Sequence, residues 1–351
     1  MENVKGLLSS TIRGQKIFRQ ILDDLRDPVK AYKNLYGKSK KSMRSPGYKI
    51  YSLVHKPRSH DLNHHPYYDI GDFIIEAEKY GIPQTRHRLI LLGVRSDLDI
   101  QPEILSRESS VTVDMVINDL PQIRSQISRS NGLTLQDTDE SWVKSLKELT
   151  ANGVASEIER SLFESIVETI NNLKNFRHGA GAEFVPTSRK ISHRPDWYYD
   201  ERIGGVCNHS GRAHIIGDLH RYLFASSFAK MHRRSPILAD YPVKLLPKHK
   251  NVAEAVSVGK FADRFRVHLE HEPAKTITSH ISKDGHYYIH PDPAQCRTFT
   301  VREAARIQTF PDNYFFCGPR TAQYVQVGNA VPPLLANKIA SVVYKIFLTI
   351  K

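Results

Sequence analysis

Apolar residues near the start of the chain repeat at the spacing of a helix face. Five of them, separated by three or four positions, predict an amphipathic helix over residues 15–26. A short apolar run then predicts a strand over 48–54. The members of the helix face are Ile17, Phe18, Ile21, Leu22 and Leu25.

A second helix and a second strand are predicted shortly afterwards. Residues 72–80 carry a helical pattern that Gly81 would end, because glycine readily adopts the left-handed conformation at a helix C-terminus. The sequence QTRHRLILLGVRSD then places an unbroken apolar run at 89–94. Such a run is typical of a strand buried on both faces inside an α/β sheet, so residues 1–98 indicate an α/β region.

The character of the chain changes after about residue 100. Prolines are scattered through the segment up to residue 265, and one long amphipathic helix is predicted there. The stretch HGAGAEF at 178–184 follows this helical pattern and not a strand, so it predicts a turn and not a phosphate-binding loop. The apolar face of the helix consists of Ile158, Leu162, Ile166, Ile170 and Leu173.

Regular patterns return from residue 266 onward. Alternation on both sides of 283–285 predicts a hairpin. Thr300 followed by Glu303 predicts a capping box at the start of a short helix. A turn at Gly328 and Asn329 would precede a last helix whose polar, exposed N-terminus suits an anion such as a cofactor carboxylate. The apolar face of that helix is Leu335, Ile339, Val342 and Ile346.

Composition narrows the class of partner. The 351 residues include 50 Lys and Arg against 37 Asp and Glu, for a net charge of +13 and a pI near 9.5. A strongly basic chain favours a polyanion, and nucleic acid is the first choice. No apolar stretch comes near the roughly 20 residues of a membrane span, and the N-terminus lacks a signal-peptide core. We therefore expect a cytoplasmic protein with no membrane partner.

Several side chains are candidates for chemistry or binding. Arg86 and Arg88 lie one residue apart at the entrance of the 89–94 strand and point the same way. They form either an ordinary charged strand edge or a site. The basic loop 38–49 is equally compatible with a solvated linker and with a loop that contacts phosphates. His286 and His290 would share a strand face, but no third ligand accompanies them, so we expect no metal there.

Two stretches of the middle region mix cations with aromatic residues. They are SRKISHRPDWYYDERIGG at 188–205 and HRRSPILADYPVKLLPKHK at 232–250. Such mixtures suit a groove that holds phosphates while side chains reach base edges, although basic aromatic loops also occur on ordinary surfaces. The aromatic residues concerned are Trp197, Tyr198, Tyr199 and Tyr241.

Three long segments resemble the later motifs of DNA cytosine (carbon-5) methyltransferases. They are YGIPQTRHRLILLGVR, TVREAARIQTFPDNYFF and QVGNAVPPLLANKIA, in the order in which that family has them. The resemblance covers residues 1–98 and 266–351 and implies a catalytic domain made of both. It leaves 99–265 as the target-recognition domain, which in this family varies with the double-stranded DNA sequence that is read.

The resemblance also implies roles for individual residues. Arg88, with Arg86 beside it, would hold a flipped cytosine through its carbonyl oxygen. Glu2 lies in a Glu-Asn-Val motif that is followed by Lys-Gly-Leu-Leu, and in the family this glutamate contacts ring nitrogen 3 of the base. The last motif would place Gly328, Asn329 and Ala330 at S-adenosyl-L-methionine. The base has to leave the helix stack, because its ring is otherwise covered.

The sequence departs from the family pattern in one large respect. In the family, a Phe-x-Gly-x-Gly cofactor loop and a Pro-Cys nucleophile precede Glu-Asn-Val, and neither is found here. None of Cys207, Cys296 and Cys317 follows a proline, and they lack the CxxC spacing of a zinc site. We assign all three to packing or surface roles. The implied fold is an incomplete doubly wound methyltransferase sheet plus a mixed, largely irregular recognition domain.

Three explanations follow from this departure. A second polypeptide carrying the Phe-x-Gly-x-Gly and Pro-Cys motifs would complete a split enzyme, in the setting of a restriction-modification system. Alternatively, the chain is the product of a broken gene or an incomplete gene model. A third possibility is a catalytically inactive module that binds a specific DNA sequence. The retention of Glu2, Arg86, Arg88 and Asn329 favours a methyltransferase component.

Overall fold

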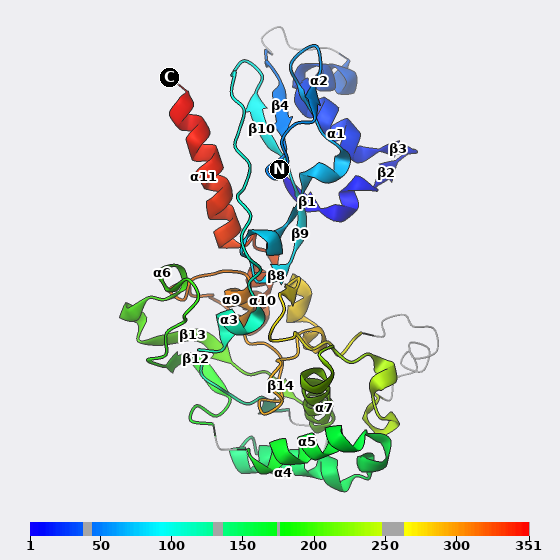
Figure 1. Cartoon of the computed structure of the whole chain (residues 1–351), viewed down its shortest axis with the longest axis vertical. Helices are drawn as coiled ribbons and strands as arrows, with labels where there is room; N and C mark the ends of the chain where they lie inside the picture. Colours follow the sequence, from blue (N-terminus) through cyan, green and yellow to red (C-terminus); the bar gives the residue numbers. More distant parts are fainter. Residues whose placement is uncertain (38–43, 129–135, 174–175, 248–262, 351) are drawn as a thin grey trace. The chain divides into compact units, whose positions relative to one another are not determined.

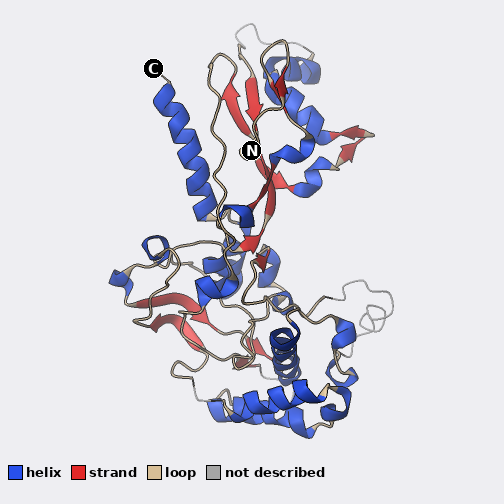
Figure 2. Ribbon diagram, viewed as in Figure 1, coloured by secondary structure: helices blue, strands red, loops and turns tan. Residues whose placement is uncertain are grey.

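The computed structural model describes residues 1–37, 44–128, 136–173, 176–247 and 263–350. Its helices and strands divide into two compact units (Figure 1). The first unit comprises residues 1–110 and 333–351, and the second unit comprises 111–332. Figure 2 shows how short most of the strands are. The fold is mixed α/β with small sheets; the division into catalytic and recognition domains drawn from the sequence stays a prediction.

The first unit contains two sheets that share one continuous segment of chain. Strands β1 (Glu2–Val4), β9 (His87–Ile90) and β7 (Ile74–Glu76) form an antiparallel sheet in the order β1-β9-β7. Strand β10 (Leu92–Arg95) pairs antiparallel with β4 (Tyr48–Tyr51). The sheets described in this unit are antiparallel, and the doubly wound sheet implied by the family stays a prediction.

The apolar run 89–94 is two strands, where the sequence predicted one. At Leu91 the backbone N–H donates to the carbonyl of Met1 at 2.9 Å, and the Leu91 carbonyl accepts from the N-terminal ammonium at 3.0 Å. On one side of this residue the chain pairs with β1 and β7, and on the other side it pairs with β4. The change of partner divides the strand, while Leu89, Ile90, Leu91 and Val94 are buried as predicted.

The predicted helix over 72–80 is wrong, because the segment is a strand between two 3-10 turns. The turns are η2 (Ile70–Phe73) and η3 (Ala77–Tyr80), and β7 lies between them. Backbone pairing of β7 with β9 outweighs the helical spacing of the apolar residues. Gly81 does end the segment in the left-handed conformation, with φ of 78°.

Helix α1 (Ile17–Arg26) confirms the first predicted helix and packs on the sheets with its apolar face. Its Phe18 is fully buried among Ile50, Phe73 and Leu89. A further helix, α2 (Pro28–Tyr36), follows directly; Asp27 caps it by accepting from the Lys30 N–H at 2.9 Å. The remaining short elements of this unit are η1 (Lys5–Leu8), β2 (Thr11–Ile12), β3 (Gln15–Lys16), β5 (Ser59–His60), β6 (Pro66–Tyr67) and β8 (Gln84–Thr85).

The last helix, α11 (Pro333–Thr349), begins at a proline, as predicted. Ile346 packs against Tyr51 and Val94, and Lys345 pairs with Glu103 at 2.5 Å. Among the described residues, the helical stretch 320–349 is long and apolar enough by length and composition to cross a membrane. That is weak evidence, because core helices of soluble proteins pass the same test, and the stretch consists of two helices separated at 330–332.

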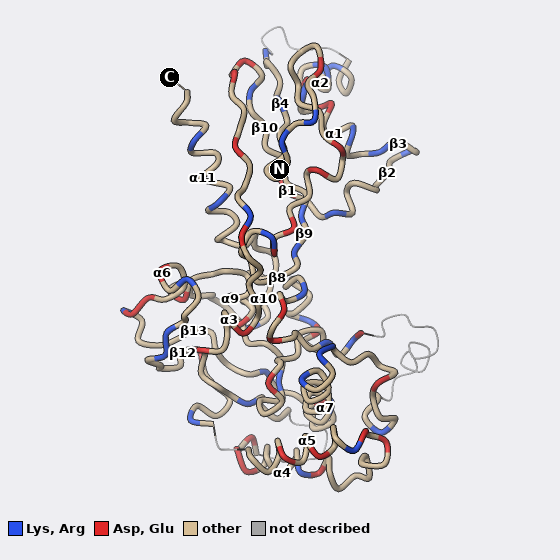
Figure 3. The backbone as a smooth tube through the Cα atoms, in the orientation of Figure 1, with Lys and Arg blue, Asp and Glu red and all other residues tan. Residues whose placement is uncertain are grey.

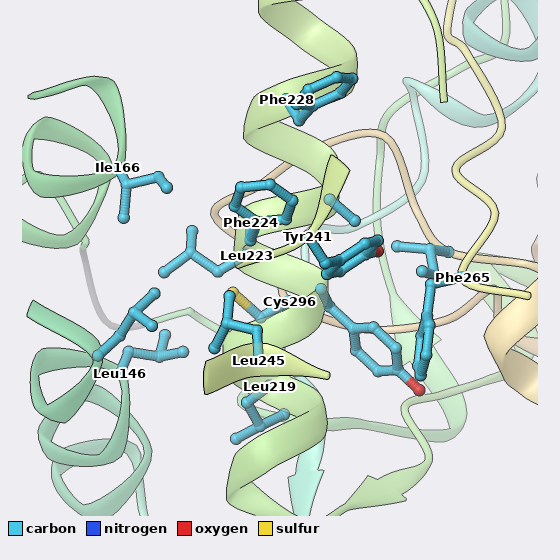
Figure 4. Packing of buried hydrophobic residues seen from close by; sticks show 14 of the residues in the cluster. Leu146, Ile166, Leu219, Leu223, Phe224, Phe228, Tyr241, Leu245, Phe265 and Cys296 are labelled. Atoms are coloured by element: carbon cyan, nitrogen blue, oxygen red, sulfur yellow. The ribbon is translucent and has the colours of Figure 1, made fainter. Parts of the chain in front are cut away.

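A helical layer forms the larger core of the second unit. Helices α4 (Asp139–Ala151), α5 (Arg160–Asn171) and α7 (Ile216–His232) pack against one another. Leu146 and Ile166 point toward Leu223 of α7, as Figure 4 shows. The amphipathic helix predicted from Ile158 onward is therefore confirmed over the bounds of α5, with its apolar face buried.

Short strands and turns make up the rest of the second unit. Strands β12 (Gly181–Pro186) and β13 (Gly205–Ser210) pair antiparallel, and β11 (Gln126–Ile127) runs parallel to β14 (Ala213–His214). The other elements are α3 (Val113–Ile117), η4 (Val154–Glu157), α6 (Pro195–Tyr198), η5 (Glu201–Ile203), η6 (Leu238–Asp240), η7 (Val243–Leu245), β15 (Ala274–Lys275), η8 (Ser279–Ser282), η9 (Gly285–Tyr287), α9 (Val301–Ile307) and α10 (Arg320–Asn329).

Three sequence predictions in this unit are wrong. The turn predicted at 178–184 is present only over 178–180; from Gly181 the chain forms β12, because residues 205–210 supply a pairing partner distant in sequence. The predicted hairpin around 283–285 is absent. The chain forms the 3-10 turns η8 and η9 instead, in which backbone carbonyls accept hydrogen bonds from N–H groups of the same turn. Consequently His286 and His290 do not share a strand face. Groups of three or more metal-ligating side chains are absent from the described part of the chain.

The motif around α9 is a buried ionic core. Thr300 and Glu303 form the predicted capping box, and Glu303 also pairs with Arg297 at 2.6 Å, both side chains being 1% exposed. Burial opposes ionisation of Glu303, but Arg297 outweighs it and holds the pKa of Glu303 well below its usual range. Arg306 pairs with Asp312 at 2.7 Å and with Asp119 at 2.8 Å. These contacts tie α9 to the segments on either side of it.

We predict that the chain loses stability as the pH falls from about 6.5 toward 4. Burial lowers the pKa of His209 and of His268 to about 4, so each stays neutral in the folded state where the unfolded state binds a proton. The contribution of each neutral histidine to the free energy of unfolding is complete above about pH 6.5. It declines by roughly 3 kcal/mol for each histidine as the pH falls toward 4. Urea unfolding at pH 7, 6, 5 and 4 measures it. His209→Gln should flatten the profile and His280→Gln, at an exposed position, should not; a wild-type profile independent of pH would contradict the account.

Candidate functional site

Glu2 and Arg88 are brought together by the pairing of β1 with β9. The antiparallel register sets Glu2 opposite Ile90 and Val4 opposite Arg88. The Glu2 carboxylate Oε1 lies 3.3 Å from Arg88 Nε, and the two side chains are 38% and 18% exposed. Arg88 also donates from Nη1 to the carbonyl of His87 at 2.9 Å. A carboxylate and a guanidinium distant in sequence thus form a partly accessible pair.

Arg86 lies beside this pair and is buried. Arg86 comes directly before β9 in the sequence, and the residue is only 5% exposed. Burial, together with the neighbouring Arg88 guanidinium, lowers the pKa of Arg86 to about 10, and Glu2 acts in the opposite direction. Burial lowers the pKa of Arg88 as well, again opposed by Glu2. Both guanidinium groups remain charged at neutral pH, so the site offers two sets of donors and one carboxylate.

The chemistry available at this site is hydrogen bonding and charge stabilisation. A guanidinium is a donor only, whereas a carboxylate accepts, or donates once protonated. Such a pair complements a planar ring that carries a carbonyl oxygen next to a ring nitrogen. His87, between the two arginines, is held by Glu78 through its Nε2 at 2.7 Å. The sequence carries no pattern that would have singled out Glu78.

The three cofactor candidates of the last motif, residues 328–330, belong to the second unit. Gly328 and Asn329 form the C-terminal end of α10 and not the predicted turn, because the helix hydrogen bonding continues through both. Gln308 donates from Nε2 to the Val327 carbonyl at 2.7 Å and to the Ala330 carbonyl at 3.4 Å. The Asn329 side chain is exposed, and Ala330 is half-buried. Asn329 therefore offers its amide to solvent at the end of a helix.

Gly328 has a packing role that the sequence did not reveal. A Cβ added there would lie 2.2 Å from the Thr278 carbonyl carbon and 2.2 Å from the Ser279 nitrogen. Both atoms are backbone and cannot move aside as a flexible side chain would. Only glycine allows α10 to approach this close to the start of η8.

Most of the aromatic residues proposed for DNA contact serve the protein interior. Tyr198 is 1% exposed and donates its hydroxyl to the Arg306 carbonyl at 3.2 Å. Trp197 donates to the Thr309 carbonyl at 2.9 Å, and Tyr241 is 6% exposed in the helical core. Tyr199 is half-buried with Lys190 above its ring at 5.0 Å. Tyr198 and Tyr241 are thus too buried to reach DNA bases, which corrects that interpretation.

Two of the three cysteines lack the surroundings of an activated thiol. Burial raises the pKa of the half-buried Cys207, and it raises the pKa of the fully buried Cys296 well above the ordinary value. Nucleophilic cysteines generally have a lowered pKa. Cys317 is exposed and lies in the sequence FFCGP.

Comparison with known proteins identifies the family. The family model described as C-5 cytosine-specific DNA methylase matches residues 60–345. The chain belongs to this family. The matched span includes Arg86, Arg88 and residues 328–330, whereas Glu2 lies before it.

Individual relatives are type II methyltransferases. M.Bpa9945I of Bacillus paralicheniformis is 36% identical over 275 residues, which is 77% of this chain and 49% of the relative. M.AgeI of Thalassovita gelatinovora is 39% identical over 77% of this chain and 64% of its own length. M.DdeI of Desulfomicrobium norvegicum is 26% identical over 78% of this chain and 54% of its own length. The matched part of this chain therefore corresponds to about half to two thirds of these relatives.

We predict that Gly328→Ala is strongly destabilising although alanine favours helices. The added methyl group collides with the backbone at 278–279, and overpacking of this kind costs at least about 2 kcal/mol. Gly217→Ala in α7 is the matched control, because its Cβ would meet only the flexible Arg221 side chain at 3.4 Å. Urea unfolding of the two variants measures the difference. Equal stability of both would refute the packing role of Gly328.

Proposed function

We propose that this chain is a component of a DNA (cytosine-5-)-methyltransferase of a restriction-modification system. It would transfer a methyl group from S-adenosyl-L-methionine to a flipped cytosine in a specific double-stranded DNA sequence. The observation that carries the proposal is the Glu2–Arg88 pair with Arg86 beside it, in a chain of the C-5 cytosine-specific DNA methylase family. A reaction on chromosomal DNA agrees with a cytoplasmic location.

Each side chain of the pair has a distinct task on the base. Arg88, aided by Arg86, donates to the carbonyl oxygen of cytosine. Glu2, in its protonated form, donates its proton to ring nitrogen 3 and so neutralises the negative charge that develops on the ring when a thiolate adds to carbon 6. Burial of Arg86 strengthens its hydrogen bonds, because the local dielectric constant is lower than in water. The base must be extruded from the duplex to reach these groups.

The cofactor contributes the methyl group, and this chain supplies only part of its binding site. Asn329 offers an exposed amide, and Ala330 follows it at the end of α10. Gly328 acts by packing against the segment at 278–279, which fixes the position of Asn329. One amide and one helix end are too few groups to hold a molecule of this size. In this proposal a second polypeptide supplies the remaining contacts.

The attacking cysteine also has to come from elsewhere. None of the chain's cysteines follows a proline, and two of them have a raised pKa. A second polypeptide with the Phe-x-Gly-x-Gly and Pro-Cys motifs would complete the enzyme. Residues 99–265 would then serve as the target-recognition domain, flanked by catalytic segments at 1–98 and 266–351.

A DNA-binding module without catalytic activity is the competing proposal. The raised pKa of Cys207 and Cys296 favours it over an enzyme that acts alone. The two proposals differ in what happens on mixing with a chain that carries the missing motifs. Methyl transfer that appears only in the mixture supports the split enzyme, and sequence-specific binding with no transfer in any mixture supports the module.

We predict that Glu2→Gln slows methyl transfer far more than it weakens DNA binding. The amide keeps the shape of the side chain and can donate a hydrogen bond, but it cannot release a proton to ring nitrogen 3. The rate of methyl transfer should therefore fall about 100-fold or more. Single-turnover methylation with the complementing polypeptide, alongside DNA affinity, measures both effects. Glu103→Gln is the control, since Glu103 belongs to the same unit and pairs only with Lys345 in the structure. Equal losses of rate and affinity would disprove the role of Glu2.

A further inference from the structure

We propose that a basic cleft in the second unit binds the sugar–phosphate backbone of duplex DNA. The inference rests on the proposed function, because it names the surface by which the recognition domain would engage its substrate. The cleft has a volume of about 510 Å³. It is lined by Pro121, Gln122, Asn172, Leu173, Phe176, Arg177, His178, Pro186, Thr187, Ser188, Arg189 and Ala294.

The charge of this lining is of one sign. Arg177 and Arg189 contribute guanidinium groups and His178 an imidazole, and the described residues that line the cleft include no carboxylate. Among the residues that the structure describes, neither guanidinium has an ion-pair partner, and both residues are exposed. Two unpaired cations facing a cleft without acids attract an anion.

Two other exposed arginines of the same unit are neutralised. Arg160 pairs with Glu164 at 2.8 Å, and Arg202 pairs with Asp200 at 2.6 Å. Helices α4 and α5 carry acidic residues among their basic ones, as Figure 3 shows. The guanidinium groups of the cleft therefore lack the neutralisation that Arg160 and Arg202 have.

The uncharged lining residues suit a phosphate backbone. Gln122 and Asn172 bring amide donors, and the hydroxyl of Ser188 is a further donor. The Thr187 hydroxyl accepts from the Arg189 backbone N–H at 3.1 Å, which fixes the turn that carries Arg189. Contacts of this kind position DNA without reading its sequence.

The cleft walls are attached to rigid parts of the unit. On one wall, Leu173 and Phe176 pack against the helical core. On the other wall, residues 187–189 follow β12, whose Val185 is buried. Preorganised walls lower the entropic cost of binding, so the two guanidinium groups can each neutralise one phosphate.

The salt dependence of DNA affinity tests the cleft directly. The full chain is titrated into a fluorescent 24-base-pair duplex of fixed sequence at several KCl concentrations, and anisotropy reports binding. Each phosphate contact adds about 0.9 to the slope of log K against log salt. The double variant Arg177→Ala, Arg189→Ala should lower that slope by about 1.8 and weaken binding more than 10-fold at low salt. Arg177→Lys, Arg189→Lys should retain most of the slope.

The matched control is the double variant Arg160→Ala, Arg202→Ala. It removes the same number of exposed cations from the same unit, but both are already paired with carboxylates, so the slope should not change. Equal slopes for wild type and the cleft variant, with DNA binding intact, would overturn the proposal that the cleft binds DNA. The proposed function would remain in place. Failure of the wild-type chain to bind DNA with or without a complementing polypeptide would instead remove the proposed function. Polyglutamate binding to the cleft as tightly as the duplex would overturn the assignment to DNA.

Discussion

Backbone pairing between β1 and β9 is the constraint on which the functional account depends. The register places Glu2 opposite Ile90 and brings its carboxylate to Arg88, and the two hydrogen bonds between Met1 and Leu91 extend that register by one residue. Side chains alternate between the faces of a strand, so a slip of one residue would move Glu2 to the opposite face. The site is therefore specified by strand register before any side chain is considered.

In the second unit, many of the residues that carry the family resemblance stabilise the fold and do not face a substrate. The motif TVREAARIQTFPDNYFF contributes a capping box and two buried arginines, Arg302 and Arg306, which are satisfied by carboxylates or carbonyls. Its Glu303 also pairs with the buried Arg297, which precedes the motif. Removing one partner of a buried ion pair is costly, because the remaining charge stays in a poorly polarisable interior. Gly328 likewise acts through close backbone packing. These residues hold the framework, while Glu2, Arg86, Arg88 and Asn329 are the ones that we propose contact a substrate or a cofactor.

The sequence predicted best where local signals agree with tertiary contacts. The apolar face of α1, the capping box at Thr300 and the buried face of α11 all follow from spacing or from adjacent residues. It failed where long-range pairing decides, as at 72–80, at 181–186 and at the division of the 89–94 run by Met1. For the site, resemblance named Glu2 and Arg88, but only the structure shows that they contact each other. Burial of Tyr198 and Tyr241 depends on residues more than a hundred positions away or on core packing, which no local pattern reveals.

The most direct test of the central claim is methyl incorporation by a variant whose own cysteines are replaced, Cys207→Ser, Cys296→Ala, Cys317→Ser. Transfer from labelled S-adenosyl-L-methionine to duplex DNA is measured in the presence of a polypeptide carrying the Phe-x-Gly-x-Gly and Pro-Cys motifs, after urea unfolding has verified that the variant is folded. The account predicts activity equal to that of the wild-type mixture, and loss of activity when the cysteine of the second polypeptide is changed to alanine. Loss of transfer in the folded cysteine-replaced variant would contradict it.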